Sequence, residues 1–294
     1  MEYSTLLDTA ASPHISASDR LLFVTAFAIS SLSGNRVKER SGRKPFNPML
    51  GETFELIRED RGYRFLAEKV CHRPACMAWH AESARWSVNQ SPLPTQKFWG
   101  KSAELIVDGH VRLALHETGD RYSWTGATCF LRNIIAGEKY LEPVNTITVH
   151  DERNGTHDVV EFAKAKGLFA GRSEGVTALL LGPRGAEPLD AGLVGKWTSD
   201  LATTTAPDDP IWTAGDLVPA APRCYGFTTF AASLNELLPR DAEALPPSDS
   251  RLQQRAEEGD LDTAEGFKKA LEEAQRERRR ELEERGRSGS RRGL

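Results

Sequence analysis

The sequence predicts a mainly β fold with helical appendages, built as a large near-complete antiparallel β-barrel with helices at both ends. Three observations lead to this prediction. Segments rich in Val, Ile, Thr and aromatic residues alternate with polar residues from about position 52 to 197 and are separated by turn signals. Helical patterns are confined to the two ends of the chain. A hydrophobic fraction of 39% over 294 residues is ample for one large core.

Composition excludes several classes of protein. A generic nucleic-acid binder would show a basic surplus, but 38 basic residues stand against 42 acidic ones. The longest apolar run, residues 21–29, is far shorter than the roughly 20 residues that a membrane span needs, and no secretory signal is recognisable. Four cysteines without a CxxC pair indicate reduced thiols and no zinc site. No other metal and no cofactor is expected. We therefore expect a cytoplasmic protein that meets membranes only at their surface.

The first unit, residues 1–43, is predicted to be helical. Ser18 and Asp19 can cap a helix in which residues 21, 22, 25, 28 and 29 share one face, and Ser33-Gly34 ends it. A basic stretch follows. The next unit opens with Lys44-Pro45-Phe46-Asn47-Pro48, which we expect to be rigid and extended because each proline restricts its own φ and the residue before it.

The central unit, residues 44–225, is predicted to be the β-barrel. Asp60-Arg61-Gly62 separates strand-like residues 54–57 and 63–66, and Asp108-Gly109, a strong hairpin signal, separates 104–107 and 111–115. Further turn signals lie at 118–120, 153–155 and 183–185. Such a series of hairpins indicates one large antiparallel sheet, and closure into a barrel would remove its edges and enclose a cavity.

The last unit, residues 226–294, is predicted to be a C-terminal helical subdomain with a disordered tail. Of the 44 residues from Arg251 onward, 23 are charged, and residues 262–285 contain no proline and one glycine. This composition is typical of a long solvated helix. The small and charged residues 286–294 are expected to form the tail.

Three sets of residues could carry chemistry. His72 and Arg73 follow a predicted strand and precede a proline, which suits an anion such as phosphate, although spacing alone favours a loop whose side chains face water. Cys71-His72 as nucleophile and base is disfavoured, since adjacent strand residues point to opposite faces. Lys44 and Asn47 flank prolines and are either held for a ligand or simply exposed. Lys268, Glu272 and Arg276 form an i, i+4, i+8 stripe, commonly only a ladder of ion pairs.

Three motifs occur in order along the chain. Residues 44–55 contain Lys-Pro-Phe-Asn-Pro-Met-Leu-Gly-Glu, residues 68–75 read Glu-Lys-Val-Cys-His-Arg-Pro-Ala, and residues 245–252 read Leu-Pro-Pro-Ser-Asp-Ser-Arg-Leu. They resemble the ligand-binding domain of the oxysterol-binding protein family, known in fungi as Osh proteins. The corresponding family stretches are Lys-Pro-(Phe/Leu)-Asn-Pro-x-Leu-Gly-Glu, Glu-Gln-Val-Ser-His-His-Pro-Pro and Leu-Pro-x-(Thr/Ser)-Asp-Ser-Arg-Leu. The resemblance covers nearly the whole chain.

The resemblance implies a barrel around a lipid tunnel and a lipid-transfer function. Such a domain binds phosphatidylinositol 4-phosphate and exchanges it for a second lipid, sterol or phospholipid, between membranes. It would act peripherally at membrane contact sites, and an endoplasmic-reticulum receptor would be bound by regions outside this chain. Family headgroup contacts, carried over motif by motif, fall on Lys44, Asn47, His72, Arg73, Lys268, Glu272 and Arg276.

The chain departs from the family pattern at two places. Arg73 replaces the second signature histidine, and its permanent charge and forked donors preserve anion binding. This variant looks like a fungal subgroup with Glu-Lys-Val-(Ser/Cys)-His-Arg-Pro, for which the second lipid stays open. The family's lid precedes the equivalent of Glu2-Tyr3-Ser4, so we expect the lid to be missing from this chain.

Two other function classes compete with lipid transfer. A phosphoinositide sensor or adaptor at membrane contact sites would bind the lipid with little net transport. An enzyme is not expected, because the sequence contains no Gly-x-Ser-x-Gly elbow, P-loop or HExxH motif. Transfer and sensing need the same headgroup site, so the residues alone do not separate them.

Overall fold

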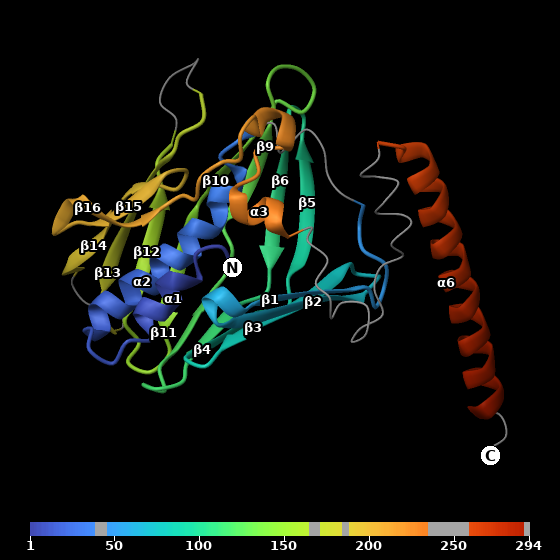
Figure 1. The fold of residues 1–294 in the computed structure, drawn as a ribbon, viewed down its shortest axis with the longest axis horizontal. Helices are drawn as coiled ribbons and strands as arrows, with labels where there is room; N and C mark the ends of the chain where they lie inside the picture. Colours follow the sequence, from blue (N-terminus) through green and yellow to red (C-terminus); the bar gives the residue numbers. More distant parts are fainter. Residues whose placement is uncertain (39–45, 165–170, 184–187, 235–258, 291–294) are drawn as a thin grey trace.

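The computed structural model describes residues 1–38, 46–164, 171–183, 188–234 and 259–290. The described chain is mainly β with helices towards both ends, as predicted (Figure 1). The α-helices are α1 (Ser4–Ala10), α2 (Ala17–Ser30), α3 (Thr229–Ser233) and α6 (Leu261–Ser290), and the 3₁₀ turns are η1 (Ser31–Asn35), η3 (Glu59–Arg61) and η5 (Ala221–Cys224). In these described ranges no helix is both long and apolar enough to span a bilayer.

The strands form two antiparallel sheets instead of the single sheet expected. The larger sheet has twelve strands, in spatial order β1 (Thr53–Arg58), β2 (Tyr63–Cys71), β3 (Cys76–Ser83), β4 (Trp86–Gln90), β7 (Val111–Leu115), β8 (Arg121–Trp124), β11 (Thr146–Asp151), β12 (His157–Phe162), β13 (Gly175–Leu181), β14 (Pro188–Lys196), β15 (Asp200–Thr203) and β16 (Ala206–Thr213). The smaller has four, in the order β10 (Tyr140–Val144), β9 (Thr128–Arg132), β6 (Ser102–Asp108) and β5 (Leu93–Trp99). Closure into a barrel stays a prediction.

The hairpin predicted at Asp108-Gly109 is wrong. The two strands that flank it belong to different sheets: β6 pairs with β5 and β9, whereas β7 pairs with β4 and β8. Gly109 has a φ of 102°, and a Cβ there would lie 2.4 Å from the carbonyl oxygen of Ser91. Glycine is therefore required here because the chain passes closely behind β4 as it crosses between sheets, and not because it turns back on itself.

Three of the other predicted turns are confirmed. Residues 59–62 connect β1 and β2, residues 118–120 connect β7 and β8, and residues 153–155 connect β11 and β12, all antiparallel pairs. The turn predicted at 183–185 falls between the paired strands β13 and β14, but residues 184–187 lie outside the described part. Strands also continue past Trp197 to Thr213, further than the sequence pattern indicated.

Helix α2 is buried around nearly its whole circumference, and not on one face only. Val24, Ala26 and Phe27 are buried together with the face predicted from the sequence, and the helix packs against β11, β12, β13, β14 and β16. Its cap is Ser16, whose Oγ accepts from the backbone N–H of Asp19 at 3.0 Å, so Ser18 and Asp19 lie inside the first turn. A helix that is apolar all round belongs in a core, and α2 fills this role.

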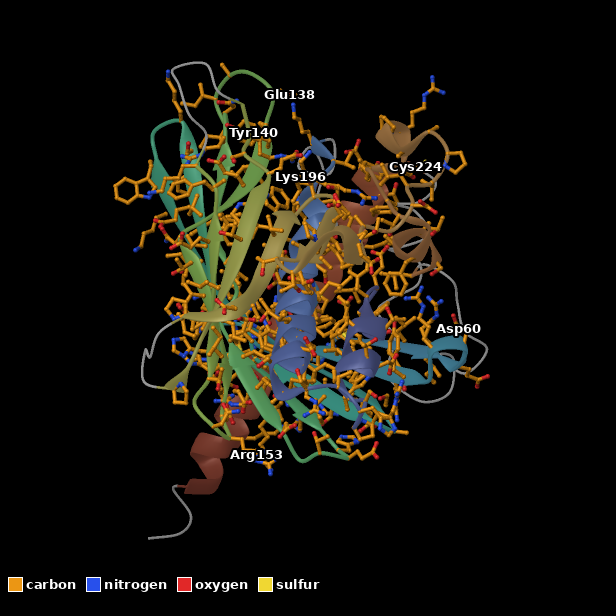
Figure 2. All side chains as sticks on the ribbon, turned by 90° about the vertical axis from the view of Figure 1, so that its left-hand side faces the viewer. Asp60, Glu138, Tyr140, Arg153, Lys196 and Cys224 are labelled. Atoms are coloured by element: carbon orange, nitrogen blue, oxygen red, sulfur yellow. The ribbon has the colours of Figure 1, made fainter. Side chains whose placement is uncertain are left out.

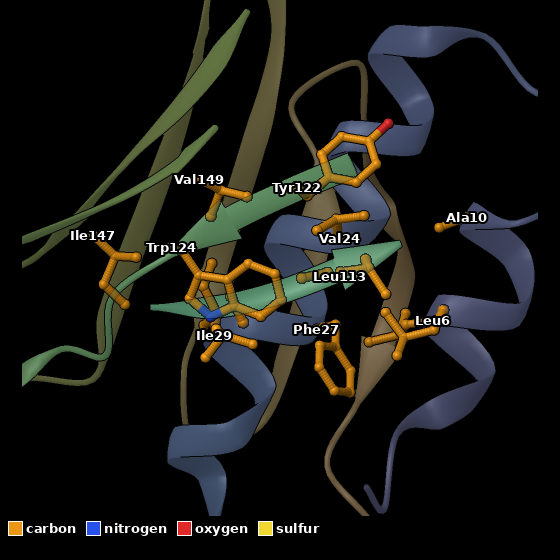
Figure 3. Packing of buried hydrophobic residues seen from close by; sticks show 14 of the residues in the cluster. Leu6, Ala10, Val24, Phe27, Ile29, Leu113, Tyr122, Trp124, Ile147 and Val149 are labelled. Atoms are coloured by element: carbon orange, nitrogen blue, oxygen red, sulfur yellow. The ribbon is translucent and has the colours of Figure 1, made fainter. Parts of the chain in front are cut away.

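The side of the larger sheet that α1 and α2 cover is called the inner face here, and its side chains join those of the helices in one core (Figure 3). Strand register defines a row across this face that we call the packed row: Leu56, Phe65, Ala81, Val88 and Leu113. All of its members except Phe65 are at least nine-tenths buried. The packed row is therefore ordinary close-packed interior.

A second row lies two residues further along the strands, towards the β2–β3 turn. This open row consists of Phe54, Ala67, Trp79 and Gln90. Ala67 and Trp79 are only half-buried, and Phe54 is 42% exposed. Phe65 stacks on Trp79 with ring centroids 5.9 Å apart and meets Phe54 at 6.2 Å, so aromatic rings continue from one row into the other. The inner face therefore opens towards the β2–β3 turn.

Helix α6 confirms the predicted C-terminal helix. Its backbone is helical to Ser290, five residues into the segment expected to form a disordered tail, and residues 291–294 lie outside the described part. The disordered tail stays a prediction. The motif at 245–252 also lies outside it. Figure 1 shows α6 standing beside the β1–β2 end of the larger sheet.

Candidate functional site

Residues 46–52 lie along the end of β2 without forming a strand of their own. The N–H of Gly51 donates to the carbonyl of Lys69 at 2.9 Å, and the N–H of Lys69 donates to the carbonyl of Glu52 at 3.1 Å. Lys69 Nζ also donates to the carbonyl of Pro48 at 2.8 Å. Gly51 has a φ of 77°, which lets the chain turn into β1. Asn47 is exposed on this segment, and Lys44 lies outside the described residues.

The signature His72-Arg73-Pro74-Ala75 forms the turn between β2 and β3. All four residues are exposed, and the Arg73–Pro74 peptide bond is cis. Cys71 and Cys76 stand opposite each other at the two ends of the turn. The sequence prediction that His72 and Arg73 lie at a strand end is confirmed. Both side chains are carried by a short hairpin turn and not by the core.

Helix α6 is held against this region. Gln275 Nε2 donates to the carbonyl of Leu50 at 2.8 Å, joining the helix to the Phe46–Glu52 segment across 225 residues of sequence. The less exposed side of α6 contains Ala264, Phe267, Lys268, Leu271, Glu272, Gln275 and Arg279. Within it, Lys268 Nζ donates to Glu272 Oε1 at 2.5 Å, and the Lys268 side chain is only 17% exposed. Lys268 and Glu272 therefore face the domain.

The electrostatics indicate that the turn and the helix share one site. Desolvation, together with the charges of Lys69, Arg279 and Arg73, lowers the pKa of His72, and Glu272 opposes this shift. The hydrogen bond from Lys268 lowers the pKa of Glu272, and the charges of Lys268, Arg276 and Lys69 act in the same direction. Lys69 thus acts on residues of both elements, and the site is cationic with one carboxylate inside it.

Arg276 does not share the face of α6 on which Lys268 and Glu272 lie. Its side chain is 52% exposed, and its guanidinium donates to Glu273 at 2.6 Å and lies 3.9 Å from Glu272. The i, i+4, i+8 spacing drifts around the helix, so Arg276 stands at the edge of the face that Lys268 and Glu272 occupy. Arg279, seven residues after Glu272, returns to that face and is one of the charges acting on His72.

Two cations of the site were missed by sequence reasoning. Lys69 lies inside the signature, and its role in tying residues 48–52 to β2 depends on tertiary contacts. Arg279 could have been found by extending the helical stripe with the i+7 spacing from Glu272. With them, three segments that are distant in sequence supply cations and hydrogen-bond donors to one surface. Such a surface suits a phosphorylated anion, because charge-assisted hydrogen bonds from Arg and Lys are the strongest that proteins offer to phosphate.

Metal ligation finds no support in the described part of the chain, where no group of three or more His, Cys, Asp or Glu side chains gathers in a metal-binding arrangement. The four cysteines are all free thiols. The apolar open row ends beside the cationic turn, since only Thr53 separates Phe54 from the Phe46–Glu52 segment. The site therefore joins a cationic rim to an apolar wall.

Comparison with known proteins agrees with this geometry. A family model for oxysterol-binding proteins matches residues 1–292. The chain is 47% identical over 281 residues to oxysterol-binding protein homolog 3 of Saccharomyces cerevisiae, covering 95% of this chain and 28% of that protein. It is 37% identical over 289 residues to human oxysterol-binding protein-related protein 7, covering 97% of this chain and 34% of that protein. The chain thus spans about a third or less of these relatives.

Solved structures show the same fold. The Osh3 ORD of Saccharomyces cerevisiae in complex with PI(4)P superimposes with a TM-score of 0.87 at 46% identity, covering 96% of this chain and 75% of that one. The Osh1 ORD in complex with cholesterol superimposes with a TM-score of 0.82 at 27% identity, covering 97% and 72%. This chain belongs to the oxysterol-binding protein family.

Proposed function

We propose that this chain is a lipid-transfer domain that binds phosphatidylinositol 4-phosphate and exchanges it for a second lipid between membranes, acting peripherally at their surface. The observation that carries the proposal is the docking of α6 beside the signature turn. The charges of Arg279 and Glu272 on α6 act on the pKa of His72, and Lys268 is hydrogen-bonded to Glu272. A relative of 46% identity that holds PI(4)P in its solved structure supports the same ligand for this chain.

The headgroup would be held by complementary parts of the site. Arg73 offers a planar fork for phosphate oxygens, whereas Lys268 offers a compact charge. Glu272 accepts from Lys268 and can also accept from an inositol hydroxyl, which distinguishes a sugar phosphate from inorganic phosphate. Asn47 stands on the segment that α6 contacts, and we include it, Lys44 and Arg276 among the headgroup residues.

The acyl chains would lie along the open row. Half-buried Trp79 and Ala67 and exposed Phe54 form an apolar surface that continues from the closed core. Covering such surface is worth about 25 cal/mol per Å² of apolar area removed from water, so an acyl chain of the right length would bind there by the ordinary hydrophobic effect. The second lipid is a sterol or a phospholipid that would compete for this wall.

The first test removes the two signature cations. His72→Ala with Arg73→Ala should weaken binding of a short-chain, water-soluble phosphatidylinositol 4-phosphate on the order of a hundredfold, because two charge-assisted hydrogen bonds of about 1.5–3 kcal/mol each are lost. The matched control is His116→Ala with Arg121→Ala, an exposed pair at the opposite ends of the strands. Unchanged affinity in the signature variant would overturn the proposed site.

The second test compares two adjacent lysines on α6. Lys268 is 17% exposed and bonded to Glu272, whereas Lys269 is 75% exposed and 3.5 Å from Glu265. Lys268→Ala should weaken headgroup binding about tenfold and Lys269→Ala should leave it unchanged. Equal effects would mean that α6 is only a solvated ladder of ion pairs.

Transport and sensing are separated by a transfer assay. We expect the chain to move a fluorescent phosphatidylinositol 4-phosphate from donor to acceptor vesicles at a rate that rises when acceptor vesicles carry a counter-lipid. Extraction without delivery would favour the sensor. The same assay, repeated with sterol and with phospholipid acceptors, identifies the second lipid.

A further inference from the structure

The smaller sheet ends in two turns that meet. The β5–β6 hairpin turns at Gly100, and the β9–β10 connection follows β9 through residues 133–139. The N–H of Ile134 donates to the carbonyl of Lys101 at 3.1 Å, which ties one turn to the other. Figure 2 shows Glu138 and Tyr140 of this region at one end of the molecule and Arg153 at the other. We call the two turns together the paired tips.

The paired tips expose large apolar side chains to an unusual degree. Ile135 is 74% exposed, Phe98 69% and Trp99 61%. Phe98 and Trp99 end β5 immediately before Gly100, whose φ of 59° turns the chain, and Ile135 lies between Asn133 and Gly137, which have φ values of 59° and 94°. Trp99 Nε1 donates to Glu104 Oε2 at 3.0 Å, so its one polar group is satisfied and the rest of the indole is free for apolar contact.

Cations surround these side chains. Lys101 and Lys139 are exposed on the two turns, and Lys97 is exposed near the end of β5, opposite Glu104 in register. Of the nearby carboxylates, Glu138 is ion-paired with Lys38, and Glu104 accepts from Trp99. Aromatic and branched apolar side chains ringed by lysine are typical of surfaces that enter the headgroup region of a bilayer.

We infer that the paired tips are a membrane-docking element that inserts Phe98, Trp99 and Ile135 into the surface of an anionic bilayer. Three projecting side chains are far fewer than the 20 to 30 residues a side that a stable protein interface uses, whereas a bilayer surface can accept them singly. The lysines would meet anionic lipid, whose negative surface potential attracts basic side chains. This docking would bring the proposed lipid-transfer domain to a membrane, and it does not depend on a phosphoinositide in the bilayer.

The docking element is separate from the headgroup site. Strand β5 begins beside β3, where the N–H of Met77 meets the carbonyl of Pro92 at 3.5 Å, and runs seven residues to Trp99. A strand of this length spans about 20 Å, so substitutions at the paired tips leave the signature turn untouched. Docking and headgroup binding can thus be measured separately.

The test uses the whole chain and phosphatidylcholine vesicles with or without phosphatidylserine, none of them containing a phosphoinositide. Phe98→Ser with Trp99→Ser should lower partitioning onto phosphatidylserine vesicles at least about tenfold. Leu179→Ser with Leu189→Ser, an exposed apolar pair on the larger sheet, is the matched control and should have no effect. Lys97→Glu with Lys101→Glu should remove the preference for phosphatidylserine, while Lys196→Glu should not.

Separate readouts keep the outcomes distinct. The tip variants should keep their melting temperature and their affinity for short-chain phosphatidylinositol 4-phosphate. Vesicle binding that is unchanged in the Phe98→Ser and Trp99→Ser variant overturns the inference. Absence of vesicle binding by the unaltered chain also overturns it and would indicate that the paired tips bind a protein instead. If the unaltered chain does not bind short-chain phosphatidylinositol 4-phosphate, that result contradicts the proposed function and leaves the docking inference standing.

A different observation supports a second inference. Cys71 and Cys76 are directly opposed across the β2–β3 hairpin, and both are free and half-buried. Directly opposed residues of antiparallel strands share a face, with Cα atoms about 4.5–5.5 Å apart. This separation lies within the range that a disulfide requires.

We infer that Cys71 and Cys76 form a reversible disulfide across the signature turn on reaction with a hydroperoxide. The first thiolate attacks a peroxide oxygen of hydrogen peroxide, giving a sulfenic acid and hydroxide, which takes up a proton to become water. The second thiol then displaces water from the sulfenic sulfur and closes the S–S bond, so one peroxide is reduced to water and two thiols are oxidised. The bridge would close a loop around His72 and Arg73.

The test treats the intact chain with hydrogen peroxide and maps its disulfides by mass spectrometry. We expect a Cys71–Cys76 linkage that dithiothreitol reverses, and its loss in Cys71→Ser and in Cys76→Ser. Cys129→Ser, at a buried thiol, and Cys224→Ser, at an exposed one, are controls that should keep it. Oxidation that leaves Cys71 and Cys76 unlinked, or links either one to Cys224, overturns the inference.

Discussion

Two ends of the same inner face differ in how completely they are packed. In the packed row, Val88 and Ala81 are fully buried and Leu113 is 2% exposed. In the open row, two residues further along the strands, Phe54 is 42% exposed. Phe54, Ala67 and Trp79 of the open row are as apolar as the packed row and lie on three strands that the packed row also crosses, so the difference comes from what covers them. The packed row joins the core that holds the buried side chains of α1 and α2, whereas the open row lies beside the cationic turn.

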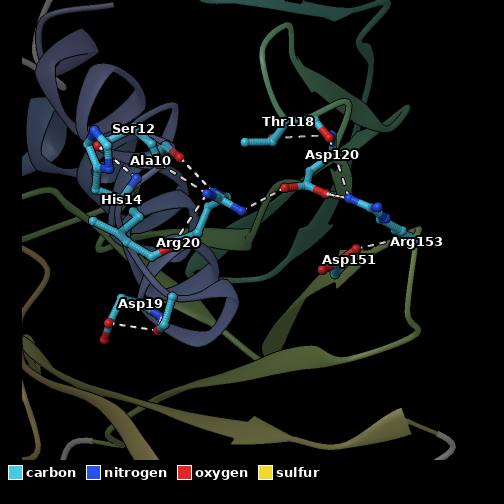
Figure 4. Close-up of polar contacts among 11 residues, drawn as sticks. Ala10, Ser12, His14, Asp19, Arg20, Thr118, Asp120, Asp151 and Arg153 are labelled. Carbon is cyan, nitrogen blue, oxygen red and sulfur yellow. Dashed lines mark hydrogen bonds and ion pairs between the residues drawn. The ribbon is translucent and has the colours of Figure 1, made fainter.

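The largest expected effect concerns the contact that holds the helices over the packed end (Figure 4). Arg20 Nη1 donates to Asp120 Oδ2 at 2.8 Å, and its other donors reach the carbonyls of Ala10 at 2.9 Å and Ser12 at 3.0 Å. Arg20→Ala should lower the free energy of unfolding by about 3–5 kcal/mol, because Asp120 loses its buried partner. Denaturant titration measures this.

The same carboxylate offers a matched control. Arg153 also lies 2.8 Å from Asp120, but its side chain is 67% exposed. Arg153→Ala should cost no more than about 1 kcal/mol. If Arg20→Ala and Arg153→Ala lower the free energy of unfolding equally, the buried ion pair contributes no more than the exposed one. Other contacts would then hold the helices over the sheet.

The next effect compares the two rows directly. Leu113→Ala should lower the free energy of unfolding by about 2–5 kcal/mol, as expected for a buried leucine whose cavity does not collapse. Phe54→Ala removes more atoms but should cost under about 1 kcal/mol, because much of the ring is already in water. Phe54→Ala should instead speed the release of long-chain lipid. A large stability loss with unchanged lipid release would place Phe54 in the core.

A buried carboxylate under α2 provides a pH-dependent test of the packed end. Thr25 Oγ1 donates to Asp158 Oδ2, and Oδ1 has no hydrogen-bond partner within the described residues. Burial raises the pKa of Asp158 to about 6, although the hydrogen bond from Thr25 and the charge of His157 oppose the shift. The ionised form is therefore a cost to the folded state at neutral pH.

The sign of the effect follows from linkage. The folded pKa lies above the unfolded one, so the contribution of Asp158 to stability is fully present below the unfolded pKa and is lost as pH rises through about 6. Asp158→Asn should raise the free energy of unfolding by up to roughly 3 kcal/mol at about pH 7 and by little near about pH 4. Asp190→Asn, at an exposed position, should show no such gain. A pH-independent change at Asp158 would contradict this assignment.

The smallest expected effect lies at the open end. Desolvation and the neighbouring cations lower the pKa of His72, and a bound phosphate would reverse this shift. Binding of short-chain phosphatidylinositol 4-phosphate should therefore take up protons. As pH falls, the affinity of the unaltered chain should rise a few-fold more than the affinity of His72→Gln. Calorimetry in buffers of different ionisation enthalpy measures the uptake. His116→Gln should behave like the unaltered chain, and equal uptake in His72→Gln would exclude His72 from the site.

Local signals in the sequence predicted local structure well. Asp60-Arg61-Gly62 joins two strands that pair with each other, so turn chemistry was enough to predict β1 and β2. Asp108-Gly109 carries a stronger signal and failed, because pairing of β6 with β9 and of β7 with β4 depends on partners distant in sequence. The burial of Val24 and Phe27 likewise depends on strands that follow more than a hundred residues later.

The site shows the same limit. Motif spacing placed His72 and Arg73 correctly at a strand end and predicted the helix that carries Lys268 and Glu272. It could not decide how α6 is rotated against the domain, since every residue of a charged helix is compatible with solvent. The contact of Gln275 with Leu50 fixes that rotation, turning Arg279 inward and leaving Arg276 at the edge.

The central claim is that lipid lies on the open row while the packed row stays closed. A phosphatidylinositol 4-phosphate with a photoreactive group in its acyl chain tests this most directly, with labelled residues mapped by mass spectrometry after irradiation of the complex. The account predicts labels at Phe54, Ala67 and Trp79, abolished in the His72→Ala and Arg73→Ala variant, and none at Val88 or Leu113. Labels on the packed row, or labels elsewhere that persist in the signature variant, would contradict it.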